Sequence, residues 1–263
     1  MRAFDRDREE VIARAIQAGV GAIITVGIDL KSSRRAVELA ERYTGVYAAV
    51  GFHPHDASAL KSEDMAELAD MARHPRVVAI GEIGLDFYRN YSPREAQVQA
   101  MERQLELAAG LEMPVIVHCR QAERDILSIL GEWLSSHKGA RGQALGVVHC
   151  FNGTRESVRR YLDMGFCLSV GAYIGYPRSV DIYDAVRDIP EDRLLVETDC
   201  PFLSPQVHRG KRNEPSYLPL TIESLAAIRD GSPEQLAART TTNAQRLFGI
   251  KVETGSGVST QAE

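Results

Sequence analysis

Pro114–Cys119 reads PVIVHC, a short run of apolar and mostly β-branched residues that ends beside a histidine. No polar residue interrupts it before His118, which is typical of a strand buried on both faces of a parallel sheet. Helical stretches separate this run from six similar ones, so the sequence predicts an α/β fold with a parallel sheet or barrel. The other six runs are Gly21–Val26, Val46–Gly51, Val77–Glu82, Leu145–Cys150, Phe166–Gly171 and Leu194–Asp199.

The stretches between the runs have the apolar spacing and the end signals of helices. Ser232 and Pro233, for example, are a typical helix start, and Ser92 is the expected N-cap of a helix that opens with Pro93. The helices predicted after the first strand run are Asp29–Arg42, Pro93–Gly110, Glu123–His137, Thr154–Met164, Val180–Arg187, Leu218–Arg229 and Pro233–Thr241.

The order of the first elements departs from that of a complete barrel. The chain opens with an amphipathic helix, Asp5–Ala18, whereas a (β/α)8 barrel opens with a strand. Seven strand runs are present where eight are needed. We therefore expect a TIM-like (β/α)8 barrel that lacks its first strand, formed by residues 1–250, followed by a disordered polar tail at residues 251–263.

Composition narrows the class of protein. With 31 Lys and Arg against 36 Asp and Glu, the net charge of the 263 residues is −5, and 44% of the residues are hydrophobic. Such a chain folds into a globular core and is not a general nucleic-acid coating protein. The longest uncharged stretches, such as Ala15–Ile28, are too short to span a bilayer. Four scattered cysteines form no disulfide framework, so we expect a reduced, cytoplasmic protein.

Charged and imidazole side chains follow several of the strand runs directly. They are His53 with His55, Glu82, His118, His149 and Asp199. Parallel barrels keep their catalytic groups at this end of the strands, and histidine nitrogen with carboxylate oxygen suits Zn, Mn or Mg. Glu82 can bridge two ions. Each residue also has a plainer reading: the histidines as satisfied core residues, Glu82 as a rim ion pair, and Asp199 as a turn cap before Pro201.

Three cysteines each follow one of these residues: Cys119, Cys150 and Cys200. Strand alternation predicts that they point to the helix layer and pack there, rather than bind metal. The loop after the last strand run carries Arg209, Lys211 and Arg212, which are suited to phosphate. Arg120 points the same way as His118 and can also meet an anion.

Six motifs in order resemble those of the TatD-type metal-dependent deoxyribonucleases. They are GFHPHDA (Gly51–Ala57), GEIGLDFYR (Gly81–Arg89), VIVHCR (Val115–Arg120), VHCFNG (Val148–Gly153), ETDCPFL (Glu197–Leu203) and RGKRNEPSYL (Arg209–Leu218). The resemblance runs from Phe4 to about Ile250. It implies an amidohydrolase-type barrel with two divalent ions, Mg, Mn or Zn, that cleaves phosphodiester bonds, often from the 3′ end of single-stranded DNA.

The resemblance also implies roles for individual residues. Glu82 would bridge the two metals, and His118 and His149 would complete the second position. Asp199 would bind the first metal and act as the base. The phosphate would face the groups expected to bind substrate, which are His53, Arg120, Arg209 and Lys211.

One departure from the family concerns the first metal. The family opens with a strand that ends in D-x-H-x-H, and no H-x-H occurs near Met1, where the match begins at Phe4. Either translation starts upstream of Met1, or the first metal position keeps only Glu82 and Asp199. Two functions other than a nuclease stay open: a D-aminoacyl-tRNA deacylase or similar ester or amide hydrolase, and an inactive remnant that binds oligonucleotides. We expect a monomer.

Overall fold

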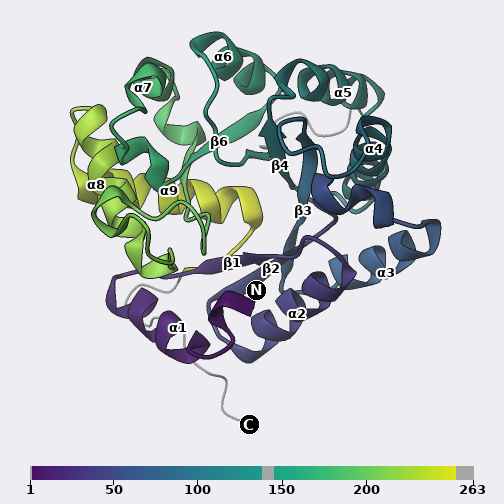
Figure 1. The fold of residues 1–263 in the computed structure, drawn as a ribbon, viewed down its shortest axis with the longest axis horizontal. Coiled ribbons are helices and arrows are strands. Elements are labelled where there is room, and N and C mark those ends of the chain that lie inside the picture. The colour runs from purple at the N-terminus through teal and green to yellow at the C-terminus, as the bar shows by residue number, and fades with distance from the viewer. Residues whose placement is uncertain (1, 138–144, 253–263) are drawn as a thin grey trace.

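The computed structural model describes residues 2–137 and 145–252, so the predicted tail lies outside it except for its first two residues. One parallel sheet holds seven strands in sequence order. Figure 1 shows the helices arranged around this curled sheet, with α1 to α8 on its outer side. The strands are β1 (Ile23–Val26), β2 (Val46–Val50), β3 (Val77–Asp86), β4 (Val115–Arg120), β5 (Gly146–Val148), β6 (Phe166–Val170) and β7 (Leu194–Val196).

The nine α-helices of the described residues alternate with the strands, as the sequence predicts, and add one that the pattern did not reveal, α3. Short 3-10 turns fill several of the connections. The helices are α1 (Arg8–Gln17), α2 (Leu30–Arg42), α3 (Ser62–Ala72), α4 (Arg94–Gly110), α5 (Glu123–Ser136), α6 (Arg155–Asp163), α7 (Tyr183–Arg187), α8 (Leu218–Ile228) and α9 (Pro233–Phe248).

The sheet does not close on itself. Within the described residues, β1 pairs only with β2 and β7 pairs only with β6, so each has one unpaired edge. All four residues of β1 are half-buried, whereas all five residues of β2 are buried. The expected barrel with seven of eight strands is therefore confirmed, and the gap lies between β1 and β7.

Side-chain caps fix where several helices begin. Asp29 Oδ1 accepts a hydrogen bond from Ser32 N at 2.6 Å at the start of α2, and Thr154 Oγ1 accepts one from Ser157 N at 3.2 Å at the start of α6. The prediction of Ser92 as the cap of α4 is wrong. The Ser92 hydroxyl instead donates to the His55 carbonyl at 2.9 Å, because the chain before Pro93 turns toward the loop after β2.

The C-terminal helix is longer than the sequence pattern indicates. It continues past Thr241 to Phe248, and its last turn packs against residues that point into the barrel, such as Ala49, Ile116 and Leu195. Figure 1 shows α9 lying across the middle of the ring of strands. Tyr47 Oη then donates to the Lys251 carbonyl at 3.1 Å, which holds the chain after α9 against β2. No helix in the described ranges is long and apolar enough to cross a membrane.

Candidate metal centre

The candidate ligands lie at the ends of their strands, and strand alternation makes their side chains face the inside of the barrel. In β4, Ile116 packs among the residues that point inward, while Val115 and Val117 belong to the core between sheet and helices. His118 lies two residues after Ile116 and therefore faces inward too, at the end of the strand. By the same spacing, His149 follows the inward-facing Val147 on β5.

One carboxylate oxygen, Glu82 Oε1 on β3, lies at the centre of the cluster. It lies 2.7 Å from His118 Nδ1 and 3.7 Å from His53 Nε2. His149 Nε2 approaches the same oxygen to 3.9 Å from the other side. Ligand atoms of His53, Glu82 and His118 all lie within 4.8 Å of one another, a spacing that one cation can bridge.

A second group of potential ligands surrounds His149. Its Nδ1 lies 2.7 Å from Glu197 Oε2, and its Nε2 lies 3.8 Å from Asp199 Oδ1. The hydroxyl of Ser169 donates a short hydrogen bond to the same Glu197 oxygen. His149 thus connects Glu197 and Asp199 to Glu82, and the four predicted ligands Glu82, His118, His149 and Asp199 lie together at the barrel mouth.

Asp86 and His55 support the cluster from the side. Asp86 is fully buried at the end of β3, with Oδ2 2.7 Å from His55 Nε2 and 3.5 Å from His118 Nε2. Neither Asp86 nor Glu197 is among the site residues predicted from the sequence. Both carry a signal in their spacing: Asp86 is four residues after Glu82 on one strand, and Glu197 is two residues before Asp199, so each shares the face of its partner.

Opposite charges compensate one another at the centre. Burial opposes ionisation of Glu82, but the facing His149 and His118 outweigh it and hold the pKa of Glu82 well below its usual range. Burial likewise opposes protonation of His149, yet Glu197 and Glu82 raise its pKa to about 10. For His118, Asp86 and Glu82 overcome burial and raise the pKa to about 9.

For the other two members of the cluster, His53 and Asp199, burial is the main cause of the pKa shift. Burial lowers the pKa of His53 to about 4, so its imidazole is neutral at pH 7. Burial also raises the pKa of Asp199 to about 6. A neutral imidazole is the form in which histidine binds a metal.

The residues present fit a divalent cation. Two buried polar atoms of the cluster, His118 Nε2 and Glu197 Oε1, have no hydrogen-bond partner among the described residues. Unpaired buried polar atoms are costly. One of the two belongs to the candidate ligand His118, and the other belongs to Glu197, which contacts the candidate ligand His149. Imidazole and carboxylate donors together are the ligand set of Zn and other first-row divalent ions.

The predicted phosphate-binding residues lie around this cluster in different ways. Arg120 is exposed, and its guanidinium lies over the Tyr88 ring at 4.2 Å from the centroid. Arg209 and Lys211 are exposed in the loop after β7, where Arg209 lies 4.1 Å from the Tyr176 centroid. His53, expected to face substrate, is 8% exposed and lies among the ligands instead.

Among the described residues, Arg212, unlike Arg209 and Lys211, is already paired with a carboxylate and is therefore not free to bind phosphate. Its two terminal nitrogens pair with Asp7 at 2.8 and 2.5 Å, and one also donates to the Ala3 carbonyl at 2.6 Å. Arg14 on α1 pairs with the buried Glu214 at 2.8 and 2.7 Å. These two arginines therefore fasten the N-terminal segment to the loop after β7.

The cysteine prediction is confirmed for Cys119 and only in part for Cys150. Cys119 packs in the outer core, where the Tyr161 hydroxyl lies 3.7 Å from its sulfur. Cys150 also packs against the outer core, but its sulfur lies within 4.8 Å of ligand atoms of His149 and Glu197. The alternation argument does not apply there, because β5 ends at Val148 and Cys150 has a left-handed backbone with φ 49°.

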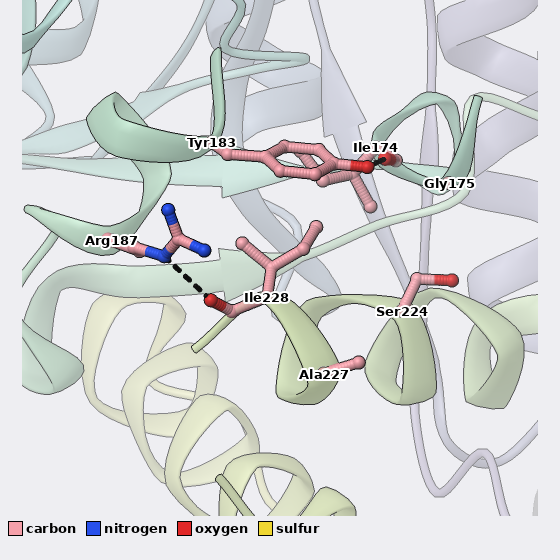
Figure 2. Close-up of a pocket in the computed structure, with 7 residues that line it drawn as sticks. All are labelled: Ile174, Gly175, Tyr183, Arg187, Ser224, Ala227 and Ile228. Atoms are coloured by element: carbon pink, nitrogen blue, oxygen red, sulfur yellow. Dashed lines mark hydrogen bonds between the residues drawn. The ribbon is translucent and has the colours of Figure 1, made fainter. Parts of the chain in front are cut away.

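A cavity of about 390 Å³ lies outside the barrel and apart from the cluster. Figure 2 shows it between α7, α8 and the 3-10 turn Ala172–Gly175, with apolar Ile174 and Ile228 on its wall. Its one guanidinium, that of Arg187, already donates to the Ile228 carbonyl at 2.9 Å and to Asp184 at 3.1 Å. None of the cluster residues lines this cavity.

Comparisons with known proteins identify the family of the chain. The family model described as TatD related DNase matches residues 1–249. The chain is 42% identical over 247 residues to "Uncharacterized metal-dependent hydrolase YabD" of Bacillus subtilis, covering 94% of each chain. It is 40% identical to "3'-5' ssDNA/RNA exonuclease TatD" of Citrobacter rodentium, covering 95% of each.

A solved structure gives the same result for the fold. The crystal structure of YJJV, a TatD homologue from Escherichia coli, superposes with a TM-score of 0.87 at 31% identity and covers 94% of both chains. Sequence and fold thus agree over nearly the whole chain, which belongs to the TatD related DNase family.

Proposed function

We propose that this chain is a divalent-metal-dependent phosphodiesterase that removes nucleotides from the 3′ end of single-stranded DNA or RNA. The observation that carries the proposal is the convergence of Glu82, His118, His149 and Asp199 within hydrogen-bonding or ion-pairing distance at the barrel mouth. The names of the TatD relatives supply the substrate class and the direction of cleavage.

Two divalent ions, Mg, Mn or Zn, are assigned to this cluster. Glu82, with His53 and His118 around its Oε1, would hold one of them, and His149 with Asp199 and Glu82 would hold the other. When bound, such ions lower the pKa of water and stabilise charge on a phosphate. This assignment differs from the sequence-based one in two ways: His53 is a ligand candidate rather than a phosphate contact, and His118 and His149 serve different ions instead of sharing the second position.

The residues of the chain then have distinct tasks. Asp199 accepts the proton of the water that attacks phosphorus, and the bond from phosphorus to the 3′ oxygen breaks as that oxygen gains a proton. Glu197 and Asp86 orient His149 and His118 through contacts of 2.7 and 3.5 Å. Arg120, Arg209 and Lys211 bind the negatively charged strand.

The direct test uses a 5′-labelled single-stranded oligonucleotide. We expect stepwise shortening from the 3′ end with added Mg²⁺ or Mn²⁺, and none after chelation of the metal. The same oligonucleotide carrying a 3′-terminal block should resist cleavage. Faster release of a D-amino acid from D-aminoacyl-tRNA would favour the ester-hydrolase alternative, and binding of the strand without metal-stimulated cleavage would identify a non-catalytic protein.

The basic loop gives a second prediction. Arg209→Gln and Lys211→Gln should each raise KM for oligonucleotides by about tenfold, because a charged contact to phosphate is lost. Each should also reduce the slope of log KM against log salt by about 0.7. Arg212→Gln is the matched control in the same loop, since its pairing with Asp7 predicts a lower melting temperature and an unchanged KM. An equal rise in KM for Arg212→Gln would contradict the assignment.

We also infer a monomeric enzyme of a reducing compartment, the cytoplasm. All four cysteines are free thiols, and the pKa of Cys119 is raised by burial to about 11, which keeps it protonated. Unpaired thiols persist in compartments where disulfides are reduced.

A further inference from the structure

Exposed apolar side chains gather at the barrel mouth. Among the described residues, five of the six large ones lie on just two loops, those after β3 and β7. The first loop follows the strand that carries Glu82, and the second loop itself contains Asp199. The five are Tyr88, Tyr91, Phe202, Leu203 and Val207. Apolar groups concentrated in this way on a surface mark a binding site more often than isolated ones do.

The loop after β3 is the more informative of the two. β3 pairs with both of its neighbours, β2 and β4, so no open sheet edge explains the exposure of Tyr88 and Tyr91, which are 53% and 67% exposed. The loop after β7 borders the unpaired edge of that strand, and we assign no ligand to its apolar residues.

Buried polar groups hold the tyrosine loop in place. Asp86 Oδ1 accepts hydrogen bonds from the backbone nitrogens of Tyr88 and Arg89 at 3.0 and 2.7 Å. The Gln97 side chain, fully buried on α4, accepts from Asp86 N and donates to the Ser92 carbonyl, both at 2.8 Å. The backbone beneath the two tyrosines is therefore fixed at both ends of the turn, and the rings are presented on a rigid support.

Contacts connect the tyrosines to the candidate metal centre and to a cation. The Tyr91 ring lies 4.8 Å from the ring of His55, whose Nε2 is 2.7 Å from Asp86. Arg120 covers Tyr88 at 4.2 Å. Two exposed aromatic rings and a guanidinium thus lie beside the ligand cluster, and rings together with a positive charge are complementary to the bases and phosphates of a single strand.

We propose that Tyr88 and Tyr91 form a stacking platform for the nucleobases next to the scissile phosphate, a role that rests on the proposed function. The platform selects unpaired strands, because bases in a duplex have no free face to offer. It reads no base edges, so it tolerates any sequence. Arg120, held over Tyr88, meets the phosphate adjacent to the stacked base.

The test compares an oligothymidylate with a strand of the same length that has phosphates and sugars but no bases. Tyr91→Ala should raise KM for the oligothymidylate by about 5- to 100-fold and leave KM for the abasic strand within about twofold of wild type. Tyr91→Phe keeps the ring and should restore most of the affinity. Tyr88→Ala also disturbs Arg120, so Tyr91 is the cleaner position. Val180→Ala is the control, because Val180 is the one exposed large apolar residue of the described chain that lies on neither loop.

Two results would overturn the platform: an unchanged KM in the Tyr88→Ala/Tyr91→Ala double variant, or an equal loss on both strands. Binding measured by fluorescence anisotropy of the same two strands separates this failure from that of the proposed function. If wild type cleaves neither strand, the nuclease assignment fails. In that case a base-dependent Kd that disappears in the double variant still supports stacking, and a Kd equal for both strands rejects it.

Discussion

Asp199→Asn is expected to lower kcat on single-stranded oligonucleotides by about 10²–10⁴-fold while the protein stays folded. Asparagine has the shape of aspartate but neither its charge nor its capacity to accept a proton. The side chain is 35% exposed at the barrel mouth and makes no short hydrogen bond to another side chain of the cluster, its nearest imidazole atom being 3.8 Å away. Steady-state kinetics at saturating metal, with a thermal melt of each variant, measures the effect.

Asp188→Asn is the matched control for this experiment. Asp188 is 31% exposed, much like Asp199, but pairs with Arg155 on the outer surface. Its loss should cost less than about 1 kcal/mol of stability and leave kcat unchanged. If Asp199→Asn retained wild-type turnover, Asp199 would have no part in proton transfer.

Glu82→Gln should have an even larger effect, because it removes both metal binding and turnover. Glu82 Oε1 is the atom to which His118, His53 and His149 all point, at 2.7, 3.7 and 3.9 Å. A neutral amide offers a cation one weak carbonyl donor in place of a carboxylate, so metal affinity should fall by more than about 100-fold. Metal content after dialysis, measured by mass spectrometry, and kcat should decline together.

Glu214→Gln provides the comparison for a buried glutamate outside the cluster. Glu214 is 5% exposed and pairs with Arg14, so this substitution should lower the melting temperature without loss of metal. A Glu82→Gln protein that kept its full metal content would refute the central position given to this carboxylate. Circular dichroism of both variants establishes that the comparison is made on folded protein.

Much of the fold could be predicted because it depends on local patterns. Uninterrupted apolar runs located all seven strands, and the count of those runs predicted the gap that the structure places between β1 and β7. The ends of strands and helices were harder to predict from the sequence. β3 runs on to Asp86 and α9 to Phe248, because pairing with β4 and packing inside the barrel extend them beyond what local preference indicates.

The candidate site was likewise predictable in part from the sequence. Glu82, His118, His149 and Asp199 could be found from their position at strand ends, since geometry common to parallel barrels brings those ends together. Ion pairs between residues far apart in the sequence could not be found in this way. Arg212 looks like its neighbours Arg209 and Lys211 in the sequence, and only the fold shows that it is joined to Asp7, 205 residues away.

The last turn of α9 fills the end of the barrel away from the candidate ligands. Leu247 and Phe248 pack there among the inward-facing residues of the strands, and Tyr47 holds the chain that follows against β2. Under the proposed function, each released nucleotide therefore leaves from the side on which the strand binds, so product departure and the advance of the next residue compete for the same space.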